Sequence, residues 1–93
     1  MITGIEKPCI AISPLTGIVY VGGFDGSDWK CYAKFSDDVD FELMGTITTG
    51  SSDQYAGMEV SNNTDGRIVF AVQNSGNVDY FESTNNGKSW SSV

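Results

Sequence analysis

The second half of the chain repeats the first half at a period of about 48 residues. Each copy reads as four short strands separated by turns rich in Gly, Asn, Asp and Ser, with no helical stretch between them. A repeat of roughly 40–50 residues that holds four strands is typical of a β-propeller blade. Two blades cannot close a ring, so we expect copies of the chain to assemble with one another. The matched segments are 10–13 with 58–61, 18–21 with 68–71, and Tyr32 with Tyr80.

The 93 residues predict one all-β unit, 1–93, made of two four-stranded antiparallel blades. Turns of two to five residues containing Gly favour hairpins, so each blade is expected to be a meander. Blade one covers about 8–48 and blade two about 55–93, while residues 1–7 are available to pair with a neighbouring subunit. The predicted strands are 9–13, 18–23, 29–35 and 41–47, then 57–61, 67–73, 78–83 and 90–93.

The second strand of each blade is a continuous apolar run, at 18–21 and at 68–72. Continuous hydrophobicity indicates that both faces of the strand are covered, as in stacked blades. The third strand of blade one, 29–35, alternates instead, so we expect one of its faces to be wetter.

Charge excludes several partner classes. Five basic residues against twelve acidic ones give a net charge of −7, whereas nucleic-acid binding requires clustered Lys and Arg. No run reaches the roughly 18 apolar residues of a membrane span, and the start lacks the pattern of a signal peptide. We therefore expect no nucleic-acid or membrane partner, and a cytoplasmic or virion-associated location.

The two cysteines, Cys9 and Cys31, fall on strands that a third strand should separate. Two strand spacings come to about 9.5 Å, which is beyond disulfide reach. Both are expected to be free, buried and apolar, as in a reducing compartment.

Blade two ends in a Ser-Thr-Asn-Asn-Gly-Lys-Ser-Trp segment at 83–90. It resembles the Asp-box, or BNR repeat, of sialidase-like propellers, whose pattern is Ser-x-Asp-x-Gly-x-x-Trp between the third and fourth strands. Asn or Asp accepts backbone N–H bonds in such a turn, and Gly takes the left-handed conformation. In that family the box is a folding element away from the active site, so a structural role is expected for Ser83, Asn85, Gly87 and Trp90.

Blade one carries a degenerate box at 36–43, in which Ser36 and Asp38 fit while Asp40 and Leu43 replace Gly and Trp. The resemblance implies a six-bladed ring, because sialidase-like propellers commonly have six blades. The expected assembly is a head-to-tail homotrimer, with a tetramer or dimer as alternatives.

Enzymatic activity is not expected. The chain has no His, and the sialidase mechanism uses three arginines where this subunit has only Arg67. Glu59, on an innermost strand, is expected to line a wet channel, either as a solvated residue or in a symmetric cation site. The acidic residues Asp38, Asp40 and Glu42 favour a solvated turn over a calcium loop. No cofactor and no metal are predicted.

The candidate ligand site combines aromatic rings, which stack on sugars, with polar side chains that bind hydroxyl groups. Loops on a rigid scaffold are where such residues act. The alternative is that Trp29 and Tyr55 are half-buried between blades and the polar residues only make turns. The candidates are Phe24, Asp25, Asp28, Trp29, Asp53, Gln54, Tyr55, Asn74 and Asn77.

The leading functional hypothesis is a non-enzymatic, lectin-like propeller that binds a glycan or a small polar ligand at repeated sites, where multivalency raises avidity. The alternative is a structural or accessory protein, of viral or phage type, that mediates protein–protein contacts. A third hypothesis is sequestration of a nucleotide or metabolite between subunits by Arg67, Lys30 and Lys34.

Overall fold

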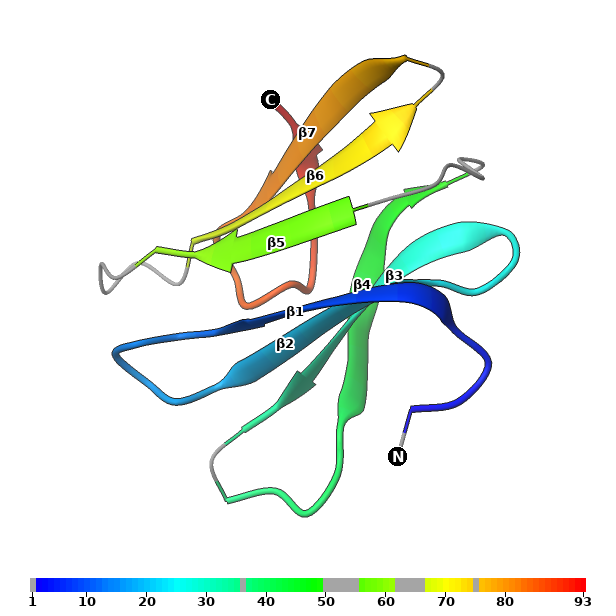
Figure 1. Ribbon diagram of the computed structural model, residues 1–93. Coiled ribbons are helices and arrows are strands. Elements are labelled where there is room, and N and C mark those ends of the chain that lie inside the picture. Colours follow the sequence, from blue (N-terminus) through cyan, green and yellow to red (C-terminus); the bar gives the residue numbers. More distant parts are fainter. Residues whose placement is uncertain (1, 36, 50–55, 62–66, 75) are drawn as a thin grey trace.

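The computed structural model describes residues 2–35, 37–49, 56–61, 67–74 and 76–93. These residues form two four-stranded antiparallel sheets, each with its strands in chain order (Figure 1). They contain no helix, and hence none long and apolar enough to cross a membrane. The first sheet consists of β1 (Glu6–Ile12), β2 (Val19–Phe24), β3 (Asp28–Lys34) and β4 (Glu42–Thr49). The second consists of β5 (Ala56–Val60), β6 (Ile68–Asn74), β7 (Asn77–Ser83) and β8 (Ser91–Ser92).

The all-β prediction and the two antiparallel four-stranded meanders are confirmed. The largest differences lie at the ends of the chain. β1 begins three residues earlier than predicted, because a register shift between Glu6 and Cys9 lets the strand continue past Pro8. Lys7, inside this irregularity, has a φ of 52°. β8 keeps only Ser91–Ser92 of the predicted 90–93 strand.

Strand register divides each sheet into an inner face, which packs on the other sheet, and an outer face. Side chains alternate along a strand, so residues paired across neighbouring strands share one face. Four rows of paired residues define the faces. The first sheet has an inner row of Cys9, Gly22 and Cys31 and an outer row of Ile10, Val21 and Tyr32. The second sheet has an inner row of Met58, Phe70 and Phe81 and an outer row of Gly57, Ala71 and Tyr80.

The core lies between the two inner faces. A chain of aromatic rings crosses it, with centroid distances of 5.5 Å from Phe24 to Trp29, 5.4 Å from Trp29 to Phe70 and 6.3 Å from Phe70 to Trp90. Trp29 and Phe70 are fully buried. The tilted and edge-on ring geometries are those that aromatic quadrupoles favour. The core thus ties the two sheets into one unit.

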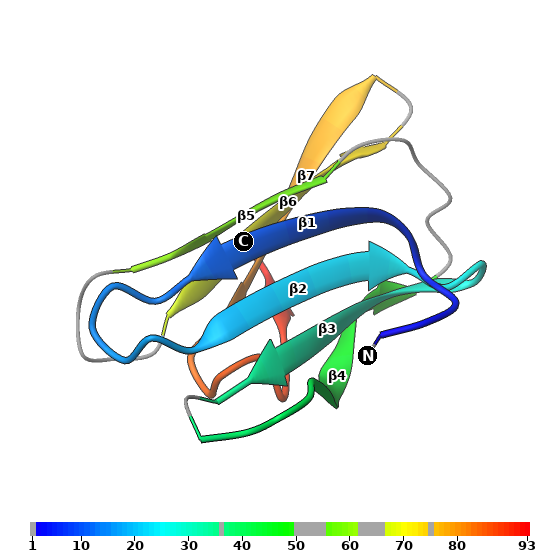
Figure 2. The ribbon, with the colours of Figure 1, turned by 60° about the horizontal axis from the view of Figure 1, so that its bottom comes forward.

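The edge strands β1 and β5, the first strand of each sheet, lie next to each other and run in the same direction (Figures 1 and 2). The sheets are therefore related by a rotation that brings the first sheet's outer row onto the second sheet's inner row. The sequence matches of 18–21 with 68–71 and of Tyr32 with Tyr80 each need a one-residue correction, and the equivalent of Tyr32 is Phe81. Because side chains alternate with a period of two, the first match equates Tyr20 with Phe70, which face each other across the core, whereas Val21 is the equivalent of Phe70.

Both cysteines are free, and Gly22 of β2 lies between them on the inner face. Cys31 is fully buried and Cys9 is half-buried. Burial raises the pKa of the Cys31 thiol to about 12, and burial also raises the pKa of Cys9.

A thiol whose pKa is raised on folding makes stability fall as pH rises. Above pH 9 the unfolded chain releases the Cys31 proton while the folded chain keeps it, so the free energy of unfolding is expected to decline between pH 9 and about 12. The slope contributed by this group is at most about 1.4 kcal/mol per pH unit. Urea unfolding at several pH values tests this, and Cys31→Ala should flatten the decline. A decline of equal slope in that variant would contradict the assignment to Cys31.

Candidate functional site

The β2–β3 and β6–β7 turns lie at the same end of the two sheets, where β4 also ends and β5 begins (Figures 1 and 2). This turn end carries every predicted ligand residue that the structure describes. Asp53, Gln54 and Tyr55 lie outside the described residues. Asn74 closes β6 and pairs in register with Asn77, which is exposed and opens β7.

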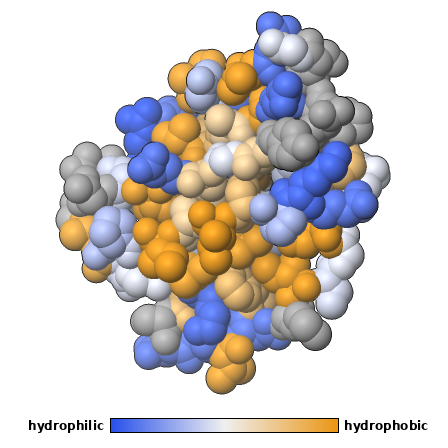
Figure 3. Space-filling view, viewed as in Figure 1, coloured by the Kyte–Doolittle hydropathy of each residue, from blue (hydrophilic) through white to orange (hydrophobic). Residues whose placement is uncertain are grey.

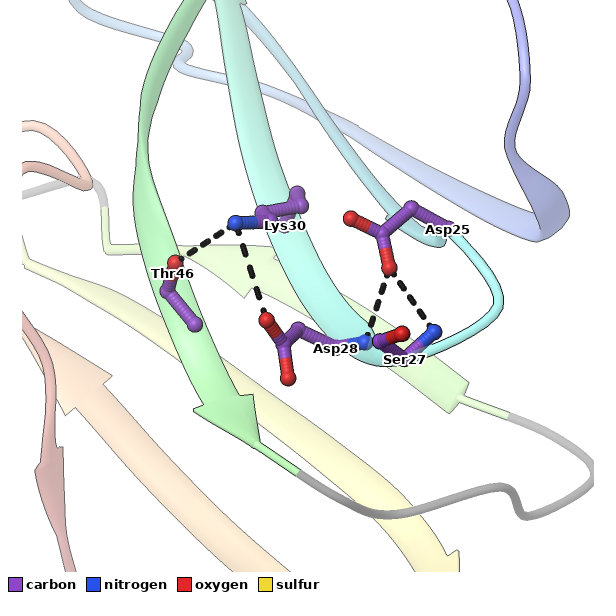
Figure 4. A network of polar contacts seen from close by, with 5 residues as sticks. All are labelled: Asp25, Ser27, Asp28, Lys30 and Thr46. Carbon is purple, nitrogen blue, oxygen red and sulfur yellow. Dashed lines mark hydrogen bonds and ion pairs between the residues drawn. The ribbon is translucent and has the colours of Figure 1, made fainter.

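The β2–β3 turn is held by Asp25 (Figure 4). One carboxylate oxygen of Asp25 accepts hydrogen bonds from the backbone N–H groups of Asp28, at 2.8 Å, and of Ser27, at 2.9 Å. These two bonds, the Asp28 bond first, lower the pKa of the Asp25 carboxyl below its usual value. Gly26, at the tip, has a φ of 99°, so the turn needs a residue without a side chain there.

Asp28 and Lys30 continue the polar end of the first sheet (Figure 4). The Lys30 ammonium donates to the hydroxyl of Thr46 on β4 at 3.0 Å and lies 3.8 Å from the Asp28 carboxylate. The side chains of Lys30 and Asp28 are 21% and 28% exposed. Lys30 thus ties the start of β3 to β4, and Asp25 is exposed at the surface.

Phe24 and Trp29 are core residues. Trp29 has no exposed surface and Phe24 is 7% exposed, because both face the inner side of the first sheet and pack against each other. A ring buried in this way does not stack on a sugar, which corrects the expectation for these two aromatics. Trp29 is also more deeply buried than in the alternative interpretation, which placed it half-buried between blades. Its indole N–H meets no acceptor among the described residues.

The 83–90 turn has the internal bonding that the Asp-box pattern predicts. Ser83, which is 2% exposed, accepts hydrogen bonds at its hydroxyl oxygen from the backbone N–H of Gly87 at 2.9 Å and of Asn85 at 3.3 Å. The Ser83 hydroxyl donates to the amide oxygen of Asn85 at 2.8 Å, and the same oxygen accepts from the backbone N–H of Ser89 at 3.0 Å. The indole N–H of Trp90 donates to the carbonyl of Gly87 at 2.9 Å.

This turn packs on the first sheet. Gly87, with a φ of 88°, sits over the thiol of Cys31, and the backbone carbonyls of Gly87 and Lys88 lie against Gly45 of β4. The hydroxyl of Tyr20 donates to the side-chain oxygen of Asn86 at 2.9 Å. The turn therefore helps to hold the two sheets together, which supports a structural role for its residues.

Removing the Ser83 hydroxyl should destabilise the protein. Ser83→Ala leaves the buried N–H of Gly87 without its acceptor, at an expected cost of about 1–3 kcal/mol. Ser89→Ala is the matched control, because the Ser89 hydroxyl only accepts an exposed bond from Asn85. Urea midpoints compare the two variants, and equal losses would contradict a special role for the Ser83 hydroxyl.

In the degenerate box of blade one, Ser36 lies outside the described residues. A carboxylate oxygen of Asp38 accepts from the backbone N–H of Phe35 at 3.3 Å, which closes a local turn. Within the described part of the chain, no group of three or more His, Cys, Asp or Glu side chains is placed to hold a metal ion.

A second candidate site, which the sequence did not reveal as a site, is a shallow hollow of about 870 Å³ on the outer face of the second sheet. The second sheet's outer row forms part of its floor, and Pro14 lies at its border. The exposed Glu59 of β5 lies here, and Arg67 forms an ion pair of 2.6 Å with Glu82. The sequence feature that could have indicated this hollow is the continuous apolar run of β6. Val69 and Ala71 of that run line the hollow instead of the core.

Comparisons of the chain with protein-family models, with curated proteins and with solved structures found no match.

Proposed function

We propose that this chain is the self-assembling subunit of a β-propeller that serves as a non-enzymatic, lectin-like binding module. The observation that carries the proposal is that each sheet has one face packed on its neighbour and exposed apolar side chains on the other face, although Val21 of β2 is buried there. On the first sheet's outer face, Ile10 is 63%, Ile12 is 61% and Leu43 is 55% exposed. On the second, Tyr80 is 50% exposed.

Apolar sheet faces of this extent are usually covered by another layer. β6 is apolar on both sides, with Phe70 in the core and Val69 and Ala71 facing out. Such a strand fits the interior of a stack of sheets. Copies of the chain supply further sheets of the same kind, and three copies give the six blades common among sialidase-like propellers.

The assembly is tested by the mass of the chain in solution. Sedimentation equilibrium or light scattering should give a multiple of the 10.0 kDa chain mass, and a trimer is expected. A folded monomer at micromolar concentration contradicts the proposal. A dimer or tetramer would keep the propeller and change its blade number.

The turn end is the proposed ligand surface, because it gathers Asp25, Asp28 and Asn77 from both sheets and an assembly repeats it. Carboxylate and amide groups bind the hydroxyl groups of a glycan or another small polar ligand. Each site is weak alone, and repetition raises the overall affinity.

A glycan array followed by calorimetric titration of the best ligand tests this surface. Asn77→Ala is expected to weaken binding at least several-fold, while Lys88→Ala, at the opposite end of the second sheet, leaves it unchanged. An equal effect of both variants places the ligand elsewhere. No response in either experiment contradicts the binding function.

The second candidate function is a structural or accessory protein that contacts another protein. The burial of Phe24 and Trp29 favours it, since it removes two of the rings that sugar stacking would use. Assembly of the chain with no response to any glycan or small polar ligand would favour this candidate over the lectin-like one.

A further inference from the structure

We propose that the outer face of the first sheet of one copy docks into the hollow on the second sheet of the next copy, with Ile10 packed over Ala71. This inference rests on the proposed self-assembly and specifies its interface. The occupant of the hollow is a second copy of this chain.

The packing of the two sheets inside the chain supplies a template for this contact. Within one copy, the second sheet's inner row packs on the first sheet's inner row: Met58 and Phe70 each approach to 3.0 Å from the position that a Cβ on Gly22 would occupy. Strand order and the shared direction of β1 and β5 make the first sheet's outer row equivalent to the second sheet's inner row. Applying the same rotation once more brings a second copy alongside the first. The outer row of the second copy's first sheet then lies on the outer row of the first copy's second sheet.

The side chains on the two docking faces are also complementary in size. In the contact inside the chain, the middle residue of the row that is packed upon is Gly22. In the proposed contact between copies, the middle residue of the corresponding row is Ala71. The side chains that pack on Gly22 are Met58 and Phe70. Their equivalents on the first sheet's outer face are the smaller Ile10, which is 63% exposed, and Val21, which is only 8% exposed. A larger residue in the floor is thus matched by a smaller residue above it, which conserves volume at a close-packed interface.

On the first sheet's outer face, Val21 is buried and Ile5 packs over Gly23, whereas Ile10, Ile12 and Leu43 stay exposed. Ile10 and Ile12, on the edge strand β1, are each more than 60% exposed. Seen from the side of β1 and β5, hydrophobic surface gathers across the middle of the molecule, with polar residues around it (Figure 3). Docking of the two outer faces removes the exposed parts of Ile10 and Ile12 from water, and each 100 Å² of apolar area buried contributes about 2.5 kcal/mol before the cost of association.

Charged side chains also lie on the two faces. Lys34, half-buried on β3, belongs to the outer face of the first sheet, in register with Val19. Its equivalent in the second sheet is Ser83, which is buried on the inner face, and the first sheet's inner face carries the row that holds Tyr20. The equivalent of that row at the open face carries Glu59 and Glu82. Glu82 is already paired with Arg67 on that face. The faces therefore bring Lys34 of one copy towards Glu59 of the next, which favours the head-to-tail pairing.

A head-to-tail contact joins two different faces, so blocking one face leaves the other competent. Ala71→Arg fills the hollow with a charged side chain, and Ile10→Asp places a carboxylate on the opposite face. Each variant alone is expected to be a folded monomer. A 1:1 mixture is expected to form a species of twice the 10.0 kDa chain mass, because one intact face of each kind remains.

Sedimentation velocity with far-ultraviolet circular dichroism measures mass and folding together. Leu15→Asp, at an exposed apolar residue of the β1–β2 turn, is the matched control and should retain the wild-type assembly. Variants that keep the wild-type mass, a variant that dimerises alone, or a mixture that stays monomeric would overturn the inference. If the wild-type chain assembles and the variants do too, only this interface is wrong, whereas a monomeric wild-type chain overturns the proposed assembly as well.

Discussion

Gly87→Ala is expected to unfold at a much lower urea concentration than Gly76→Ala, although both glycines have a φ of 88°. A Cβ is disfavoured in this left-handed region by about 1–2 kcal/mol, and both variants bear that cost. At Gly76 the added methyl group meets nothing within 4 Å, whereas at Gly87 it would lie 2.7 Å from the thiol sulfur of Cys31. Forcing this contact in a packed core adds about 1–3 kcal/mol.

The expected loss for Gly87→Ala is therefore about 2–5 kcal/mol, a large share of the total stability of a small domain. Unfolding curves at a fixed protein concentration give the difference, since assembly makes stability depend on concentration. Combining Gly87→Ala with Cys31→Ala should recover part of the loss, because the smaller side chain makes room for the methyl group. Additive losses in that double-mutant cycle, or equal losses at Gly87 and Gly76, would contradict the proposed contact.

Phe70→Ala is expected to be the most destabilising truncation in β6. Its ring is fully buried, packs against Trp29 and Trp90 and reaches Gly22 on the opposite sheet. Removal of a buried Phe ring costs about 3–5 kcal/mol, since the transfer energy is lost and a cavity is left between the sheets.

Leu15→Ala is the control for this truncation, because Leu15 is 52% exposed in the β1–β2 turn and should change the unfolding energy by less than about 1 kcal/mol. The urea midpoints of the two variants, measured at the same protein concentration, give the difference in stability. A loss for Phe70→Ala that is no larger than the control would mean that the ring chain does not join the two sheets.

Much of the local structure was predictable, because it depends on short-range chemistry. Alternation at 29–35 predicted β3, and its buried residues are the alternate ones, Trp29, Cys31 and Ala33. The Ser, Asn and Gly spacing at 83–87 predicted a turn closed by its own side chains, as the hydrogen bonds of Ser83 and Asn85 show. Turns and strand periods are set by residues that are neighbours along the chain.

The candidate site was less predictable, since burial is a property of the whole fold. Trp29 is flanked by the polar residues Asp28 and Lys30, so its sequence context is that of a surface turn. Its place in the core follows from side-chain alternation combined with the side of the first sheet that the second sheet covers. The hollow has the same origin, because Gly57, Ala71 and Tyr80 come together only through the pairing of β5, β6 and β7.

The sequence by itself determined the two strand repeats, the antiparallel meanders and the box-like turn, because each is a local consequence of residue order. Only the tertiary structure decided which face of each sheet lies inside and which stays open. A shift of one residue in strand register moves every side chain of that strand to the other face. The sequence repeat alone therefore could not decide whether Tyr20 or Val21 occupies the position in the first sheet that Phe70 occupies in the second.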